Sequence, residues 1–187
     1  MKIKFFTLIL LALSTLNSQA QEEYKQGPNS AVYETIPKGT ITKHSWESSV
    51  FPNTKRDYYI YVPAQYNASK PSALMVFQDG HAYVNNDGDF RVPTVFDNLI
   101  AQGKMPVTIS LFIDPGHGKN EPEAESPWRA SNRSLEYDEV SSTYSDFLIN
   151  EMIPELKKTY NISDDPKMRA IAGLSSGAIS AFSAAWF

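Results

Sequence analysis

The pattern of apolar and polar positions predicts two antiparallel strands near the start of the folded region. Residues 39–51 loosely alternate apolar and polar side chains, and residues 55–63 are rich in tyrosine and β-branched residues. Both patterns are typical of strands that turn one face toward a core. Before them, residues 21–37 are polar and contain glycine and proline. We therefore interpret residues 21–53 as an extended lead-in followed by the first strand.

The next segments alternate between a buried strand and an amphipathic helix. Residues 73–77 are continuously apolar and are followed by the turn-forming sequence QDGH at 78–81. Apolar residues then recur at helical spacing over 92–100, and Gly103 provides a stop signal. Residues 106–113 form a second apolar run that is rich in β-branched side chains. A strand, a helix and a strand with this crossover length predict a parallel pair.

A polar segment at residues 116–140 separates this unit from the rest of the chain. It is too long for an ordinary connection, so we expect it to overhang a functional site. Residues 142–160 place apolar side chains on one helical face, and Pro154 should kink or split that helix. Residues 167–174 predict the last strand, and 175–187 a helix of small residues. This order of elements predicts an α/β sandwich.

The turn between the last strand and the last helix has the pattern Gly-x-Ser-x-Gly, with Ser175 between Gly173 and Gly177. A serine nucleophile must protrude where a substrate and a base can both reach it, and a sharp strand-to-helix turn provides this exposure. Such a turn strains its central residue and crowds the flanking positions, which favours glycine there. The pattern predicts Ser175 as a nucleophile. The alternative is a turn that only connects the strand to the helix.

An oxyanion formed at this serine would need two hydrogen-bond donors. The backbone N–H of Ser176 is the first candidate, because it directly follows the nucleophile. The loop after the strand at 73–77 should supply the second, and Gly80 and His81 are the candidates there. The alternative interpretation of this loop is a tight turn that only closes the strand.

Several further segments carry a family resemblance. In chain order they are RDYYIYVP, LMVFQDGHAYV, PVTISLFIDPG, NRSLEYD and RAIAGLSSGAISAFSAAW. From about Thr54 to Phe187 the sequence resembles the enterochelin-esterase-like group of esterases, a branch of the α/β-hydrolases. The resemblance implies an α/β-hydrolase fold, with a mostly parallel sheet, antiparallel N-terminal strands and helices on both faces.

The same resemblance implies an activity and a set of site residues. Members of the group hydrolyse siderophore trilactones, hydroxycinnamoyl esters on plant polysaccharide, or other acyl groups on sugars. It implies Ser175 as the nucleophile and the loop at Gly80 and His81 as part of the oxyanion hole. It also suggests that Arg133 and Glu136 form an ion pair that fixes the long polar segment, with a solvated charge pair as the alternative.

The proton acceptor of the expected reaction is missing from the predicted positions. In this fold the acid and the histidine follow the serine along the chain, whereas His44, His81 and His117 all precede Ser175. We therefore expect residues 54–187 to be the N-terminal part of an esterase domain that is truncated after the nucleophile elbow, and to be nearly inactive alone. In the alternative, His81 or His117 substitutes for the missing base.

The first 20 residues have the pattern of a secretory signal peptide. Two lysines precede an apolar run at residues 5–13, and Ser18-Gln19-Ala20 matches a small-x-small cleavage site. The apolar run is about half of the ~20 residues that a bilayer-spanning helix needs. We expect cleavage near residue 20, export to the periplasm or the outside, and no stable membrane insertion afterwards.

Composition narrows the possible partners. The net charge of −4 comes without long single-sign runs, which argues against a nucleic-acid partner. The chain has no cysteine and therefore no disulfides or thiolate ligands, and its histidines show no metal-ligand spacing with Asp79 or Asp114. We thus predict no metal, no cofactor, and a small-molecule or carbohydrate-linked ester as substrate. Two alternatives stay open: a non-catalytic carbohydrate-binding module, and an acyltransferase that uses the same serine.

Overall fold

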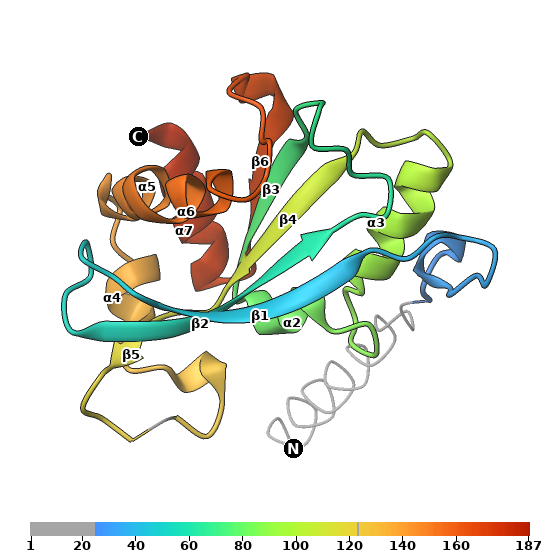
Figure 1. Cartoon of the computed structure of the whole chain (residues 1–187). Coiled ribbons are helices and arrows are strands. Elements are labelled where there is room, and N and C mark those ends of the chain that lie inside the picture. Colours follow the sequence, from blue (N-terminus) through green and yellow to red (C-terminus); the bar gives the residue numbers. More distant parts are fainter. Residues whose placement is uncertain (1–24, 123) are drawn as a thin grey trace, which may run out of the picture.

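A mixed β-sheet forms the centre of the protein (Figure 1). The computed structural model describes residues 25–122 and 124–187, so the predicted signal peptide lies outside the described residues. The main strands run in the order β1-β2-β4-β3-β6, and β5 pairs with β2. Their bounds are β1 Thr40–Glu47, β2 Thr54–Val62, β3 Ala73–Gln78, β4 Thr108–Ile113, β5 His117–Gly118 and β6 Arg169–Ala172.

The strand directions follow the sequence prediction. β1 pairs antiparallel with β2, and β2 pairs antiparallel with β4. β3 lies parallel to both of its neighbours, β4 and β6. The predicted strand-helix-strand crossover is formed by α3, Val92–Ala101, which ends just before Gly103 at a positive φ of 66°. The predicted α/β class with antiparallel N-terminal strands is therefore confirmed.

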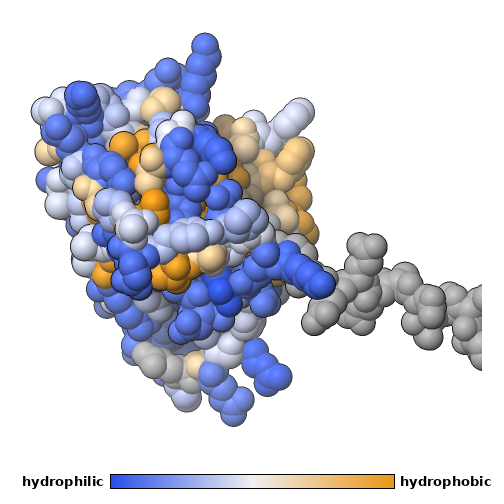
Figure 2. All heavy atoms as spheres, turned by 90° about the vertical axis from the view of Figure 1, so that its right-hand side faces the viewer, coloured by the Kyte–Doolittle hydropathy of each residue, from blue (hydrophilic) through white to orange (hydrophobic). Residues whose placement is uncertain are grey.

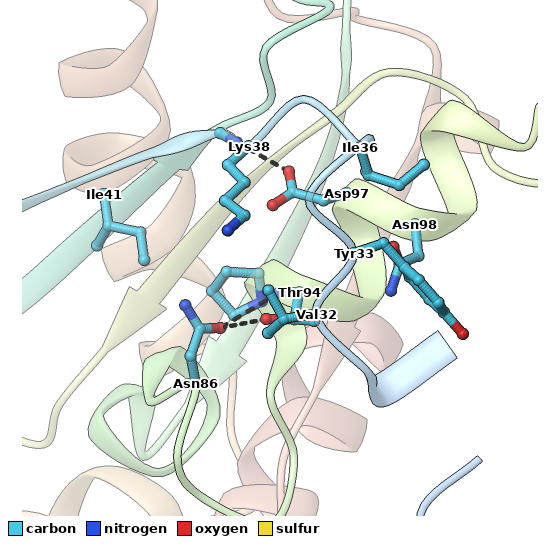
Figure 3. Close-up of a pocket in the computed structure, with 11 residues that line it drawn as sticks. Val32, Tyr33, Ile36, Lys38, Ile41, Asn86, Thr94, Asp97 and Asn98 are labelled. Carbon is cyan, nitrogen blue, oxygen red and sulfur yellow. Dashed lines mark hydrogen bonds between the residues drawn. The ribbon is translucent and has the colours of Figure 1, made fainter. Parts of the chain in front are cut away.

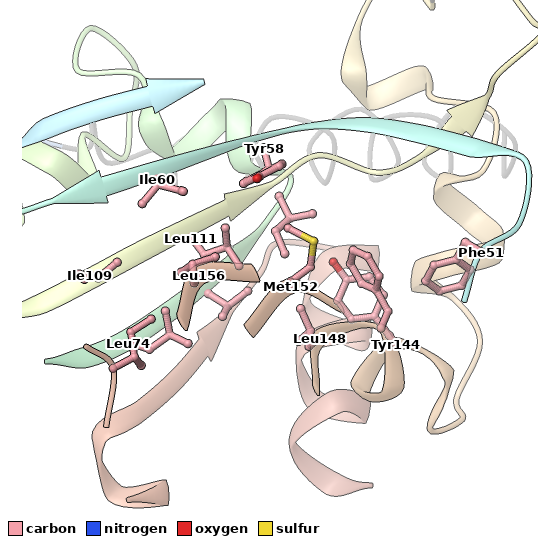
Figure 4. Close-up of a cluster of buried hydrophobic side chains, with 14 of the residues drawn as sticks. Phe51, Tyr58, Ile60, Leu74, Ile109, Leu111, Tyr144, Leu148, Met152 and Leu156 are labelled. Carbon is pink, nitrogen blue, oxygen red and sulfur yellow. The ribbon is translucent and has the colours of Figure 1, made fainter. Parts of the chain in front are cut away.

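Helices cover both faces of the sheet. One face packs against α4 (Arg133–Tyr137), α5 (Thr143–Phe147), α6 (Ile153–Lys157) and the inner side of α7 (Ser176–Trp186). Figure 4 shows this core, in which Leu74, Ile109 and Leu111 from the sheet face Leu148, Met152 and Leu156. The opposite face packs against α2 (Gly80–Val84) and α3, through aromatic residues such as Phe77, Phe96 and Phe112.

The predicted break near Pro154 takes the form of a wide helical turn. α5 continues into a π-helical turn at Leu148–Met152, and α6 begins at Ile153. Pro154 lies in the first turn of α6 and has no N–H to donate to the carbonyl four residues earlier. The chain remains helical, because the π turn absorbs the missing hydrogen bond.

The lead-in is more ordered than the sequence predicts. It contains a short 3₁₀ turn, Pro28–Ser30, and the side-chain amide of Asn98 in α3 donates to the carbonyls of Asn29 and Ala31 at 2.7 and 2.9 Å. The N–H of Gly39 donates to Asp97 Oδ1 at 2.9 Å. These bonds fix the lead-in along α3. On this side of the molecule, hydrophobic side chains form small groups among hydrophilic ones (Figure 2).

Candidate active site

The predicted nucleophile lies at a strained turn between β6 and α7. Ser175 is exposed and has φ 55° and ψ −123°, a backbone conformation that is costly for a residue with a side chain. A Cβ at Gly173 would lie 2.1 Å from the carbonyl oxygen of Gly177, so no larger residue fits there. The turn therefore has the strain and the close backbone approach that its glycines predict, and the role of Ser175 stays a prediction.

The turn lies beside the loop that follows β3. Because β6 is parallel to β3, the ends of both strands meet at the same edge of the sheet. A Cβ at Gly177 would lie 3.0 Å from Asp79 Oδ2. The helices that follow β3 cover one face of the sheet, and the helices that follow β4 cover the other face. The connections therefore change sides near β3, and ligands of α/β sheets bind at such topological switch points.

Two of the predicted oxyanion donors are unoccupied. Among the residues that the structure describes, the backbone N–H groups of Ser176 and Gly80 have no hydrogen-bond acceptor. Gly80 lies tightly against β4, since a Cβ there would be 2.4 Å from the carbonyl carbon of Phe112. Glycine is thus required at this position for packing, whether or not its N–H binds an anion.

His81, the third predicted donor, is occupied by another partner. Its backbone N–H donates to Asp114 Oδ1 at 2.9 Å, and its ring Nδ1 lies 2.7 Å from the same oxygen. Because a carboxylate only accepts hydrogen bonds, Nδ1 is assigned the proton. The expectation that this N–H lines an oxyanion hole does not agree with this geometry. The sequence could not reveal this, because Asp114 directly follows a different strand, β4.

The histidines do not form a triad with Ser175 in the described part of the chain. The ring of His81 contacts Asp114 and lies edge-on to Trp128, with ring centroids 4.5 Å apart, and its Nε2 is buried without a partner. His117 contacts the carbonyl of Gly118. Neither ring hydrogen-bonds to Ser175, so neither replaces the base in this arrangement.

The expected ion pair between Arg133 and Glu136 is wrong, because each residue pairs with a different partner. Arg133 Nε and Nη2 donate to the two oxygens of Asp79, both at 2.8 Å. Glu136 accepts from Arg56 Nη2 at 2.9 Å and from the N–H of Gly116 at 3.1 Å. Asp79 and Arg56 are buried charges that each need a counter-ion, and α4 supplies both.

Tyr137 adds a third contact from α4 to the ends of the strands. Its hydroxyl accepts from the N–H of Asp79 at 3.2 Å and lies 3.5 Å from the carbonyl oxygen of Ile113. Complete burial raises the pKa of Tyr137 well above the ordinary value, so the hydroxyl stays protonated. The sequence patterns did not indicate that Arg56, Asp79 and Tyr137 contribute to this site. Arg56 could have been noticed, because the alternation in β2 places this charge on the inward side.

A separate cavity of about 160 Å³ lies between the lead-in and α3 (Figure 3). Val32, Tyr33 and Lys38 line one side, and Thr94 and Asp97 line the other. None of the predicted site residues borders it. Within the described ranges, no cluster of three or more histidine, cysteine or acidic residues could hold a metal ion, and no helix has the length and hydrophobicity to cross a bilayer.

Comparisons with known proteins identify a family for this chain. A model of the family described as "Putative esterase" matches residues 48–187. A curated relative, the Bacillus subtilis (strain 168) protein YbbA, itself described as uncharacterized, is 22% identical over 146 residues, which cover 76% of this chain and 52% of the relative. The chain thus spans about half the length of this relative.

Solved esterase structures share the fold at low sequence identity. A ferulic acid esterase from Anaeromyces mucronatus, AmCE1/Fae1A, superposes with a TM-score of 0.59 at 18% identity, over 82% of this chain and 56% of that one. The enterobactin esterase FES from Shigella flexneri, solved with 2,3-dihydroxy-N-benzoyl-serine, gives 0.62 at 21% identity, over 88% and 37% of the two chains. These likenesses confirm the predicted α/β-hydrolase type of fold.

Proposed function

The chain belongs to the family described as "Putative esterase", and from this membership we propose that the protein is a serine carboxylic-ester hydrolase. The observation that carries the proposal is the exposed Ser175 at a strained turn beside the loop after β3. The family indicates a general esterase activity, and we assign that activity to Ser175.

The proposed reaction proceeds through an acyl-enzyme. Ser175 Oγ attacks the ester carbonyl carbon and loses its proton to a base, and the carbonyl oxygen becomes an oxyanion. The free N–H groups of Ser176 and Gly80 are the proposed donors to that oxyanion. Collapse of the intermediate breaks the bond to the alcohol, which leaves with the proton. Water then attacks the acyl group and releases the acid and the free serine.

We propose that none of His44, His81 and His117 acts as the base toward Ser175. None of the described histidines hydrogen-bonds to Ser175, and His81 is held by Asp114. Residues 1–187 by themselves should therefore hydrolyse esters slowly, because removal of a triad member costs several orders of magnitude in rate.

The substrate class and the location are proposed from the similar structures and from residues 1–20. An enterobactin esterase and a ferulic acid esterase are among the similar structures, so we propose a small-molecule or carbohydrate-linked ester as substrate. The pattern of residues 1–20 supports export to the periplasm or the outside. Fractionation of cells that express the intact gene, with and without residues 1–20, tests the location.

A fluorophosphonate probe tests the role of Ser175. The intact protein should be labelled and should hydrolyse p-nitrophenyl acetate, and Ser175→Ala should lose both properties. Ser176→Ala is the matched control, because it removes a neighbouring hydroxyl but keeps the backbone N–H. Equal labelling of wild type and Ser175→Ala would refute the proposal. Retention on a carbohydrate column without labelling would instead indicate a binding module, and transfer of the acyl group to an added alcohol in preference to water would indicate an acyltransferase.

A further inference from the structure

A buried carboxylate adjoins both segments that carry the proposed oxyanion donors. Asp79 directly precedes Gly80, has no exposed surface, and adopts a left-handed backbone with φ 56° and ψ 50°. Its Oδ2 also lies against Gly177, two residues after Ser175. Any oxyanion held by Gly80 and Ser176 would therefore form close to this carboxylate.

An uncompensated charge at this position would oppose the reaction. The transition state of ester hydrolysis gathers negative charge on the carbonyl oxygen, and a second negative charge nearby in a partly buried site repels it. At an effective dielectric of about 20, two unit charges roughly 6 to 12 Å apart repel each other enough to change the rate by about 10- to 100-fold. The protein must therefore neutralise Asp79 or tolerate a slow reaction.

Arg133 has the geometry to provide this neutralisation. Its guanidinium makes two parallel hydrogen bonds to Asp79, both 2.8 Å long, and its side chain is only 16% exposed. The guanidinium also lies over the rings of Tyr137 and Trp128, at 5.4 and 5.5 Å from their centroids. Hydrogen bonding to Asp79 raises the pKa of Arg133 further, so the cation persists at any working pH.

We propose that Arg133 is a positioning residue for catalysis, which neutralises the carboxylate of Asp79 so that an oxyanion can form next to Ser175. The inference rests on the proposed esterase function. It gives the long polar segment a chemical role, because the positive charge comes from α4 at the end of that segment.

Asp114, another buried carboxylate of this region, is already engaged. Asp114 accepts two hydrogen bonds from His81, one from the backbone and one from the ring. It lies at the end of β4, on the side of β3 that faces away from β6. Asp79 is therefore the carboxylate whose charge bears most directly on the turn at Ser175.

A competing explanation is that the ion pair only fastens α4 to the sheet. The two explanations predict different effects for the two single substitutions. If the pair is only a fastener, Arg133→Gln and Asp79→Asn both break it and should lower activity equally. If neutralisation matters, Arg133→Gln leaves an unpaired negative charge and should be the more harmful change, whereas Asp79→Asn removes the offending charge.

The test measures kcat and KM of the intact protein on p-nitrophenyl acetate, together with inhibition by phenylboronic acid, which forms an anionic tetrahedral adduct with an active-site serine. We expect Arg133→Gln to lower kcat and weaken boronate inhibition by roughly 10- to 100-fold, with KM within about twofold. The loss of kcat and of boronate inhibition in Asp79→Asn should be at least tenfold smaller than in Arg133→Gln. The double variant Asp79→Asn/Arg133→Gln should recover most of the loss of Arg133→Gln.

Controls separate the electrostatic effect from misfolding. Lys43→Gln breaks an exposed ion pair with Asp57 and should leave kcat unchanged. If Arg133→Gln does not fold, the double variant and Arg133→Lys, which keeps the charge, still decide the matter through their kcat. Equal losses in the two single variants, or no recovery in the double variant, overturn the inference. An unlabelled wild-type serine would instead overturn the proposed function and this inference with it.

Discussion

Removal of Arg56 tests how strongly the buried ion pair behind the candidate site holds the fold. The side chains of Arg56 and Glu136 have no exposed surface, and Nη1 and Nη2 of Arg56 each donate to one carboxylate oxygen of Glu136. Arg56→Met would leave the charge of Glu136 buried with only the N–H of Gly116 and the amide of Asn132 as donors. The guanidinium also lies 4.4 Å from the ring centroid of Phe147, so a methionine retains part of the packing.

The expected loss is large relative to the stability of a domain. Breaking a buried pair by removal of one partner costs about 3–5 kcal/mol, against a total free energy of unfolding of about 5–15 kcal/mol. For a protein of this size the loss corresponds to a fall in Tm of about 6–20 °C. Urea and thermal unfolding followed by circular dichroism measure both quantities.

Two further variants show whether the buried charge or the packing is responsible. Lys43→Met breaks an exposed pair and should change the free energy of unfolding by less than about 1 kcal/mol. The double variant Arg56→Met/Glu136→Leu replaces the pair by apolar groups, and it should recover most of the loss, since Arg56 Nε is buried without a partner even in the wild type. A free energy of unfolding for Arg56→Met within about 1 kcal/mol of the wild type would refute the reasoning.

Two other predictions concern the nucleophile turn and the link between β1 and the helices. Gly173→Ala should abolish fluorophosphonate labelling, because the added Cβ meets the carbonyl of Gly177 at 2.1 Å, whereas Gly27→Ala meets nothing within 4 Å and should label normally. Burial opposes ionisation of Glu151, but hydrogen bonds from Trp46 and three residues of the adjacent turn lower the pKa of Glu151 below its ordinary value. This carboxylate therefore stabilises the fold above the unfolded-state pKa and loses that effect as the pH falls through the folded-state pKa. Glu151→Gln should lower Tm more at pH 7 than at pH 3; an equal drop at both pH values would contradict this.

Local patterns in the sequence predicted most of the elements but not the contacts between distant segments. The strands at 73–78 and 108–113 follow from continuous apolar runs, and α3 follows from helical spacing, because each of these signals is contained within the element. The geometry of the turn at Ser175 follows equally from its glycines. The partners of Arg133 and Glu136 lie 54 and 80 residues away, and the spacing of the two charges suggested a local pair instead.

The single helical turn of α4 explains why charged residues can lie so close to the candidate site. Arg133, Glu136 and Tyr137 project from it to three different places: the loop after β3, the inward side of β2, and the end of β4. Each place contains a buried charge or a backbone group that would be unstable without that contact. Undocking of α4 would leave Asp79 and Arg56 unpaired at the same time. The pairing of these buried charges is therefore coupled to the docking of the long polar segment. A substitution that loosens α4 should therefore disturb both stability and the surroundings of Ser175, even though α4 contributes no reacting group.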